Sequence, residues 1–167
     1  MPHALILGQT LSGKTSLAKE LAKAYRARGI PVVVLDPMSD PEWESDFKTR
    51  DPDEFLRVLW DSEQCAGFID EAGKSAGRFD EAMIETATEG RHFGHRMHYI
   101  SQRGAQLSVT LRTQCTELFL FNTSLDDCKV HANEWGEPEL KKGNVLPHFP
   151  YYYKSRFKPV QRLHLER

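Results

Sequence analysis

The chain has 167 residues, of which 40% are hydrophobic and 28% are charged, and its formal net charge is −2. This length suits one domain whose core is large enough to fold without disulfides or a structural metal, and the composition excludes a disordered or fibrous protein. No apolar run approaches the roughly 18 residues of a membrane-spanning helix, and the N-terminus lacks signal-peptide features, so we expect neither stable membrane insertion nor secretion.

The charge is distributed unevenly along the chain. From Lys141 onward there are seven basic residues and one acidic residue, Glu166, so this tail carries 7 − 1 = +6 and the preceding residues carry −2 − 6 = −8. Such asymmetry is typical of a surface that contacts a polyanion, and equally of a solvated basic face on a terminal hairpin. Both interpretations stay open for the tail.

Metal-binding patterns are weak. The three cysteines have no paired C-x-x-C spacing, which predicts neither a disulfide framework nor a zinc site. His92, His95 and His98 recur at every third position, but Gly94 and a strand that begins near residue 97 would break any helix that aligned them. We therefore expect no metal site built on these side chains.

The first part of the chain predicts a strand, a helix and a second strand. Residues 4–7 form a short apolar run, and residues 14–28 carry apolar side chains at helical spacing. Gly29 and Pro31 would end this helix. Residues 32–35 are a β-branched run, which is typical of a strand buried on both faces of a parallel sheet.

The rest of the chain continues the alternation of helices and strands. Asp51 and Pro52 form an N-cap and first-turn signature for a second helix. The further expected elements are that helix to about 62, a strand at 65–69, a helix at 80–89, a strand at 97–101, a helix at 107–114, a strand at 117–121 and a helix at 125–134. Segments 37–41 and 136–147 contain proline and glycine and are predicted to be loops.

Residues 149–153 and 160–165 show alternating polarity and are predicted to pair as a closing C-terminal β-hairpin. Strands that alternate with helices predict an α/β fold, a mainly parallel sheet flanked by helices, with ligand sites at the carboxyl ends of the strands. We expect a single domain over residues 1–167, with a core at about 3–134 and the basic tail and hairpin at about 141–167.

Residues 8–15, Gly-Gln-Thr-Leu-Ser-Gly-Lys-Thr, match the Walker A pattern G-x-x-x-x-G-K-[ST] between the first strand and the first helix. The glycines permit a tight turn whose N–H groups surround phosphates, and the helix N-terminus adds partial positive charge. Lys14 is expected to reach the β- and γ-phosphates, and the Thr15 hydroxyl to bind Mg²⁺. The expected nucleotide contacts are Gly8, Gln9, Thr10, Leu11, Ser12, Gly13, Lys14, Thr15 and Ser16.

Phe68 and Ile69 are followed by two adjacent carboxylates, Asp70 and Glu71, which resemble the hydrolytic form of the Walker B motif. In this interpretation Asp70 holds the magnesium ion, directly or through water, and Glu71 polarises the attacking water as a general base. The alternative is a pair of exposed loop acids. A kinase of small molecules would not usually need Glu71.

Gln102 follows the end of the fourth predicted strand. A neutral amide at this position would lie beside the γ-phosphate, between the first and third strands, where it could sense that phosphate or orient the water. A glutamine after a strand is a weak signal by itself, and the two motifs that precede it strengthen the prediction.

Together these motifs resemble the FtsK/HerA group of RecA-like P-loop motor ATPases over roughly residues 3–125. The resemblance rests on the order and spacing of Val33-Val34-Leu35-Asp36-Pro37, Phe68-Ile69-Asp70-Glu71, Gly90-Arg91-His92-Phe93-Gly94-His95, Ile100-Ser101-Gln102-Arg103 and Leu111-Arg112. It implies a RecA-like sheet, ATP and Mg²⁺ as cofactors, and a homo-oligomer that forms a hexameric or pentameric ring. Gly104 is a departure, because the family often has a proline there.

The resemblance also implies an arginine finger at Arg91, which would reach the active site of a neighbouring subunit and stabilise charge on the transferred phosphoryl group. Arg103 and Arg112 are competing candidates for this role. Without the resemblance, Arg91 can also be interpreted as a cation that the helix dipole favours near the C-terminus of a helix.

Members of this group translocate double-stranded DNA, package viral genomes into capsids or export filamentous phage. The short chain most resembles viral or phage genome-packaging ATPases, which implies double-stranded DNA and capsid or portal proteins as partners, in the host cytoplasm or the virion. It also resembles Zot-like phage assembly and export ATPases. Candidate DNA contacts are Lys74, Arg78, Lys154, Arg156 and Lys158, each of which also reads as an ordinary surface residue.

Two other classes of protein stay open. A P-loop small-molecule kinase would need an acceptor pocket and an arginine-rich lid, and a nucleotide-dependent assembly switch would do no mechanical work on DNA. The chain contains no N-K-x-D motif of the GTPase type, and ATP as the nucleotide is implied by the resemblance.

Overall fold

The computed structural model describes residues 2–74 and 78–166. Its strands are β1 (Ala4–Leu7), β2 (Val32–Leu35), β3 (Phe47–Thr49), β4 (Ala66–Ile69), β5 (Arg96–Ser101), β6 (Glu117–Leu120), β7 (Pro150–Ser155) and β8 (Gln161–His164). Its helices are α1 (Lys14–Ala27), α2 (Pro52–Trp60), α3 (Arg78–Thr88), α4 (Val109–Gln114) and α5 (Leu125–Trp135), with 3₁₀ turns η1 (Ala72–Lys74), η2 (Gly90–Phe93), η3 (Gly104–Gln106) and η4 (Pro138–Val145).

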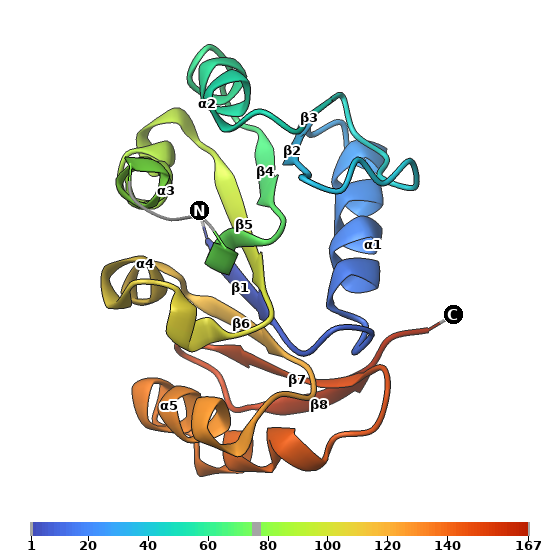
Figure 1. Ribbon diagram of the computed structural model, residues 1–167, viewed down its shortest axis with the longest axis vertical. Helices are drawn as coiled ribbons and strands as arrows, with labels where there is room; N and C mark the ends of the chain where they lie inside the picture. Colours follow the sequence, from blue (N-terminus) through green and yellow to red (C-terminus); the bar gives the residue numbers. More distant parts are fainter. Residues whose placement is uncertain (1, 75–77, 167) are drawn as a thin grey trace.

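These strands form one sheet in the order β3-β2-β4-β5-β1-β6-β7-β8 (Figure 1). β1 pairs in parallel with β5 and β6, and β4 pairs in parallel with β2 and β5. β7 pairs antiparallel with β6 and β8. The predicted fold class, a mainly parallel sheet with flanking helices and a C-terminal hairpin, is thus confirmed.

The central strand β1 shows how the alternation of side chains builds two cores. Leu5 and Leu7 point into one apolar cluster and Ile6 into the other, because successive side chains in a strand face opposite sides of the sheet. The first cluster is covered by α2, α3, α4 and α5, and the second by α1, as Figure 1 shows. β1 is therefore buried on both faces, as its continuous apolar run predicts.

Besides the short 3₁₀ turns η1, η2 and η3, the structure differs from the prediction in two elements. β3 falls between the expected second strand and second helix, and its three half-buried residues, Phe-Lys-Thr, are too few to show a strand pattern. Most of the predicted loop at 136–147 is the 3₁₀ turn η4, which packs its buried Leu140 against the core. Within the described residues, no helix is long and apolar enough to cross a membrane.

Candidate functional site

The P-loop, residues 8–15, joins the end of β1 to the start of α1. Gly13 is the N-cap of α1 in a left-handed conformation (φ 112°), and Leu11 is also left-handed (φ 65°). A Cβ atom on Gly8 would lie 2.5 Å from Ser12 Oγ, so the loop closes tightly enough to require glycine there. Gly8 and Ser12 are buried, whereas Gly13, Lys14 and Thr15 at the N-terminus of α1 line a cavity.

A cavity of about 520 Å³ lies at the carboxyl edge of the sheet, above the P-loop. Lys14, Thr15, Asp70, Glu71 and Gln102 all line it. They meet because β5 lies between β4 and β1 and all three strands are parallel, so that the residues that follow them share one edge. Thr10, Leu11, Gly13 and Ser16 line the same cavity, whereas Gln9 lines a neighbouring one of about 350 Å³.

Lys14 supplies a buried positive charge to this cavity. Its side chain is 7% exposed, and its Nζ donates a hydrogen bond to the Gln9 carbonyl at 3.4 Å. Burial lowers the pKa of Lys14, and the carboxylates of Asp70 and Glu71 oppose that shift. A phosphate group would compensate the cost of burying this ammonium group.

The carboxyl group of Asp70 is also buried, at 8% exposure. Burial raises its pKa to about 6, the charges of Glu71 and Asp36 add to that effect, and the Glu71 backbone N–H and Lys14 oppose it. A bound divalent cation would favour the ionised form. The Asp70 carboxylate and the Thr15 hydroxyl are oxygen donors of the kind that Mg²⁺ prefers, so the residues at this end of the cavity fit that ion.

Glu71 has a left-handed backbone conformation (φ 58°), which is uncommon for a residue with a side chain. Its carboxylate pairs with Lys74 Nζ at 2.9 Å, and the Lys74 side chain is 67% exposed. The left-handed backbone directly after β4 turns the chain into η1, and Glu71 still lines the cavity. Strained conformations of this kind concentrate at functional sites.

Gln102 donates a hydrogen bond from Nε2 to the Thr10 hydroxyl at 2.7 Å, which links the loop after β5 to the P-loop. Next to it, Arg103 forms two contacts with the buried carboxylate of Asp127 on α5, at 3.1 and 3.3 Å. A Cβ atom on Gly104 would lie 2.3 Å from the His131 ring, also on α5. The absence of the family's proline at this position therefore has a steric reason.

The three arginines proposed as fingers lie in different settings. Arg112 is buried, donates to the Gly104 carbonyl at 3.2 Å and pairs with Glu134 at 2.9 Å. This burial contradicts the candidacy of Arg112, because its guanidinium is held inside its own subunit.

Arg91 and Arg103 both have exposed positions. Arg91 lies before the amino end of β5, at the sheet edge opposite the P-loop, and donates to the Gln114 carbonyl at the end of α4. It therefore interacts with a helix C-terminus, that of α4, and lies away from the cavity of its own subunit. Arg103 lies beside the P-loop and lines the neighbouring cavity.

Two basic side chains of the tail make packing contacts within the chain. Lys154 is buried and donates from Nζ to the Lys158 carbonyl. The Arg156 guanidinium lies 3.7 Å from the centre of the Trp135 ring and donates to the Cys115 and Glu134 carbonyls. Lys154 and Arg156 are therefore occupied by contacts within the chain, and a role for them in DNA binding stays a prediction. Lys74 and Lys158 are exposed, and the side chain of Arg78 lies outside the described part of the structure.

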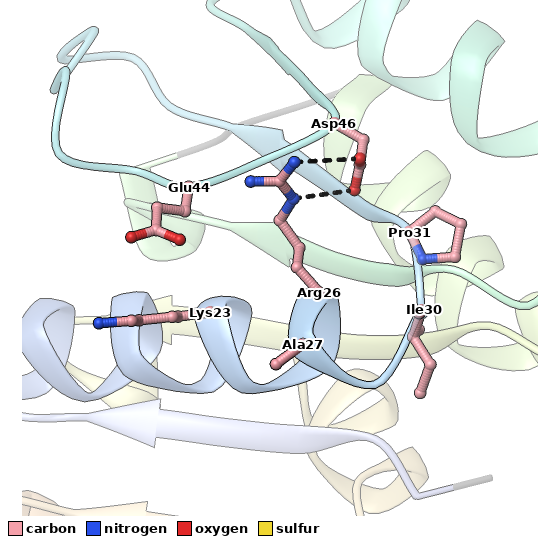
Figure 2. A pocket seen from close by; sticks show the side chains of 8 residues that line it. Lys23, Arg26, Ala27, Ile30, Pro31, Glu44 and Asp46 are labelled. Atoms are coloured by element: carbon pink, nitrogen blue, oxygen red, sulfur yellow. Dashed lines mark hydrogen bonds and ion pairs between the residues drawn. The ribbon is translucent and has the colours of Figure 1, made fainter.

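A third cavity, of about 480 Å³, lies at the far end of α1 from the P-loop (Figure 2). Arg26 and Asp46 form a paired contact across it, with nitrogen–oxygen distances of 3.4 and 3.5 Å, and Asp46 also accepts the Val32 N–H at 2.8 Å. An exposed ion pair contributes at most about 1 kcal/mol. We assign this contact to fixing the end of α1 against the start of β2.

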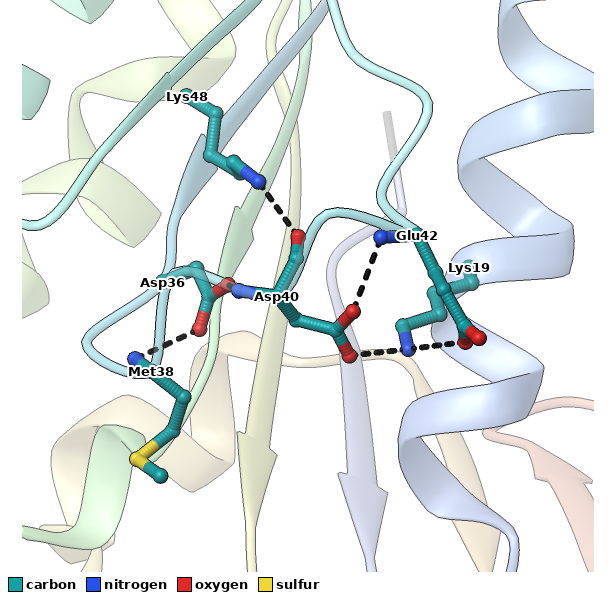
Figure 3. A network of polar contacts seen from close by, with 6 residues as sticks. All are labelled: Lys19, Asp36, Met38, Asp40, Glu42 and Lys48. Atoms are coloured by element: carbon teal, nitrogen blue, oxygen red, sulfur yellow. Dashed lines mark hydrogen bonds and ion pairs between the residues drawn. The ribbon is translucent and has the colours of Figure 1, made fainter.

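The loop after β2 borders the nucleotide cavity. The sequence motifs did not predict that this loop contributes to the cavity. Asp36 accepts the backbone N–H groups of Met38 and Asp40, and Lys19 on α1 pairs with Asp40 and Glu42 (Figure 3). Met38 and Asp40 line the cavity together with Asp36. The available signal was the position of Asp36 directly after a buried strand.

No protein-family profile matches this chain, and no curated protein matches it by sequence. Solved structures do match. The genome-packaging NTPase B204 from Sulfolobus turreted icosahedral virus 2, in complex with AMPPCP, superimposes with a TM-score of 0.81 at 17% identity, covering 98% of this chain and 96% of that one.

Larger ATPases also match. The pCW3 conjugation coupling protein TcpA has a TM-score of 0.76 at 12% identity. The match covers 98% of this chain and 59% of the TcpA chain. The type VII secretion ATPase EccC from Thermomonospora curvata has a TM-score of 0.73 at 17% identity, covering 98% and 25% of the two chains. The resemblance to FtsK/HerA-like P-loop ATPases, and among them to a viral packaging NTPase, is confirmed at the level of the fold.

Proposed function

We propose that this chain hydrolyses ATP with Mg²⁺ and uses the reaction to translocate double-stranded DNA, in the packaging of a viral or phage genome into a capsid. The observation that carries the proposal is the cavity in which Lys14, Thr15, Asp70, Glu71 and Gln102 meet. The fold similarity to B204, whose structure is described as that of a DNA-packaging ATPase, supports the DNA partner.

Each residue of the cavity has a distinct task in this mechanism. The Lys14 ammonium neutralises the β- and γ-phosphates while the P-loop N–H groups fix them. Magnesium, held by Thr15 and Asp70, would supply positive charge to the phosphate oxygens. Glu71 exchanges its contact with Lys74 for the attacking water and accepts its proton, and Gln102 orients that water or senses the γ-phosphate.

The motor is proposed to act as a homo-oligomeric ring, hexameric or pentameric, with Arg91 in the role of the trans finger. The position of Arg91 at the sheet edge opposite its own cavity supports a role between subunits. Arg103, beside the P-loop, is the competing candidate. Capsid or portal proteins are the further partners that packaging requires, and the proposed location is the host cytoplasm or the virion.

The test is ATP turnover measured against protein concentration, with and without linear double-stranded DNA at one fixed low salt concentration. Salt must be fixed because contacts with DNA phosphates are strongly ionic. A rate per subunit that rises with concentration, and rises further with DNA, is expected for a ring motor. A rate per subunit that is constant and indifferent to DNA would contradict the motor, and would favour a small-molecule kinase or an assembly switch.

A further inference from the structure

One end of the nucleotide cavity is lined by residues that no motif explains. Besides Thr15 and Ser16, the cavity is lined by His148 and Phe149, which precede β7. His148 is exposed and Phe149 is partly buried. They bring two aromatic rings into a site whose opposite end is made of carboxylates and an amide.

The strand order fixes which end is which. Asp70 and Glu71 follow β4, which lies two strands from β1 on one side. Phe149 precedes β7, which lies two strands from β1 on the other side. Because β7 is antiparallel to β6, it begins at the edge where β6 and β1 end. The carboxylates and the aromatic pair therefore flank the P-loop from opposite sides of the same edge.

Phe149 is held against the P-loop by its backbone and its ring. Its N–H donates to the Ser12 carbonyl at 3.2 Å, and its Cδ1 atom lies 3.0 Å from where a Cβ of Gly13 would stand. Its carbonyl accepts the Leu165 N–H at 3.4 Å. The backbone is left-handed (φ 80°), a costly conformation for an aromatic residue, which persists only where the surroundings impose it.

His148 extends the aromatic surface. Its ring centre lies 3.9 Å from that of Phe149, with the two planes at 67°. A triphosphate whose γ-phosphate faces Glu71 and Gln102, and whose remaining phosphates follow the P-loop toward Thr15, would direct its nucleoside away from the carboxylates. That direction leads toward the side of the P-loop on which β7 lies, where the His148–Phe149 pair lines the cavity.

We propose that His148 and Phe149 form the base subsite of this cavity, where the purine base of the bound nucleoside triphosphate packs against their rings. This inference rests on the proposed function, since it takes the orientation of the triphosphate from the catalytic roles of Glu71 and Gln102. Aromatic contact favours a base with a large π-face, so the subsite favours purine over pyrimidine triphosphates.

The test compares equilibrium binding of Mg-ATP, Mg-CTP and magnesium tripolyphosphate, which has neither base nor ribose. The variants are His148→Ala, Phe149→Leu and the aromatic-conserving Phe149→Tyr. The matched controls are His164→Ala and Phe47→Leu, which change an exposed histidine and a half-buried phenylalanine on β3, neither of which lines the cavity. Tripolyphosphate reports whether the P-loop itself stays intact in each variant.

We expect the parent to bind ATP more tightly than CTP, and His148→Ala and Phe149→Leu each to lower ATP affinity about ten-fold while tripolyphosphate affinity stays unchanged. Phe149→Tyr and both controls should keep the parent's affinity. Equal losses of affinity for ATP and tripolyphosphate would show that the two residues only shape the P-loop. An unchanged affinity for ATP would show that their rings do not contact the base. If the parent binds neither ATP nor tripolyphosphate, the proposed function itself fails.

Discussion

At the scale of single residues, the site combines buried charges with a strained backbone. Lys14 and Asp70 lose hydration by burial, and Glu71 adopts a left-handed conformation directly after β4. Such arrangements cost folding free energy and are maintained where a ligand or a reaction needs them. The role of Glu71 as general base is the most direct prediction at this scale.

Glu71→Gln should retain ATP binding and lose nearly all turnover, because an amide keeps the shape of the carboxylate but cannot accept the proton from water. Single-turnover hydrolysis and equilibrium binding of ATP measure the two properties separately. Glu85→Gln is the matched control, since Glu85 is an exposed residue on α3. A Glu71→Gln protein that hydrolyses ATP at the parent rate would remove Glu71 from the base role.

At the scale of elements, the loop that carries Gln102 depends on α5. Asp127 on α5 pairs with Arg103, and the His131 ring lies against Gly104. Arg112 connects the same loop to α5, since it donates to the Gly104 carbonyl and pairs with Glu134. α5 therefore packs against and supports the loop that carries Gln102.

Asp127→Asn should lower kcat several-fold with little change in KM for ATP, because it weakens the contact that positions the loop without touching the phosphate-binding residues. Asp126→Asn is the control, since it removes the same charge from the same first turn of α5 at an exposed position. Steady-state kinetics of both variants measure the difference. Equal kcat values in the two variants would mean that α5 does not position Gln102.

At the scale of the whole molecule, the cavity that holds Lys14 and the exposed Arg91 lie at opposite edges of the sheet. The nucleotide cavity lies at the carboxyl edge, and Arg91 lies at the amino edge, where it lines a cavity of about 480 Å³ together with Pro2, Thr116 and Phe157. In a head-to-tail ring, each subunit places one of these surfaces against the other surface of its neighbour. A two-fold dimer instead pairs the same surface of both subunits, and its interface cannot be repeated to close a ring.

Arg91→Ala subunits should poison mixed rings, so that turnover falls more steeply than the fraction of mutant subunits. Titrating the mutant into the parent protein at constant total concentration measures this curve. Arg103→Ala, titrated in the same way, tests the competing candidate. If turnover falls only in proportion to the Arg91→Ala fraction, Arg91 does not act between subunits.

The sequence by itself determined which chemical groups follow the strands. The spacing of Gly8, Gly13 and Lys14 between an apolar run and an amphipathic segment sufficed to predict the P-loop, and the order of strands and helices sufficed to predict the fold class, which the structure confirms. These are local signals, because turn geometry and the periodicity of apolar residues depend on neighbours in the chain.

Only the tertiary structure decided which distant residues share a site. Phe149 reaches the P-loop through an antiparallel strand that returns to the ligand edge, and Arg112 and Arg156 are occupied by packing contacts with α5. These outcomes depend on strand order and burial, which join residues far apart in the chain and leave no periodic signal in it. Charge and position in the sequence could therefore make an arginine a candidate for a finger or a DNA contact. The fold determined whether its guanidinium was free of contacts within its own chain.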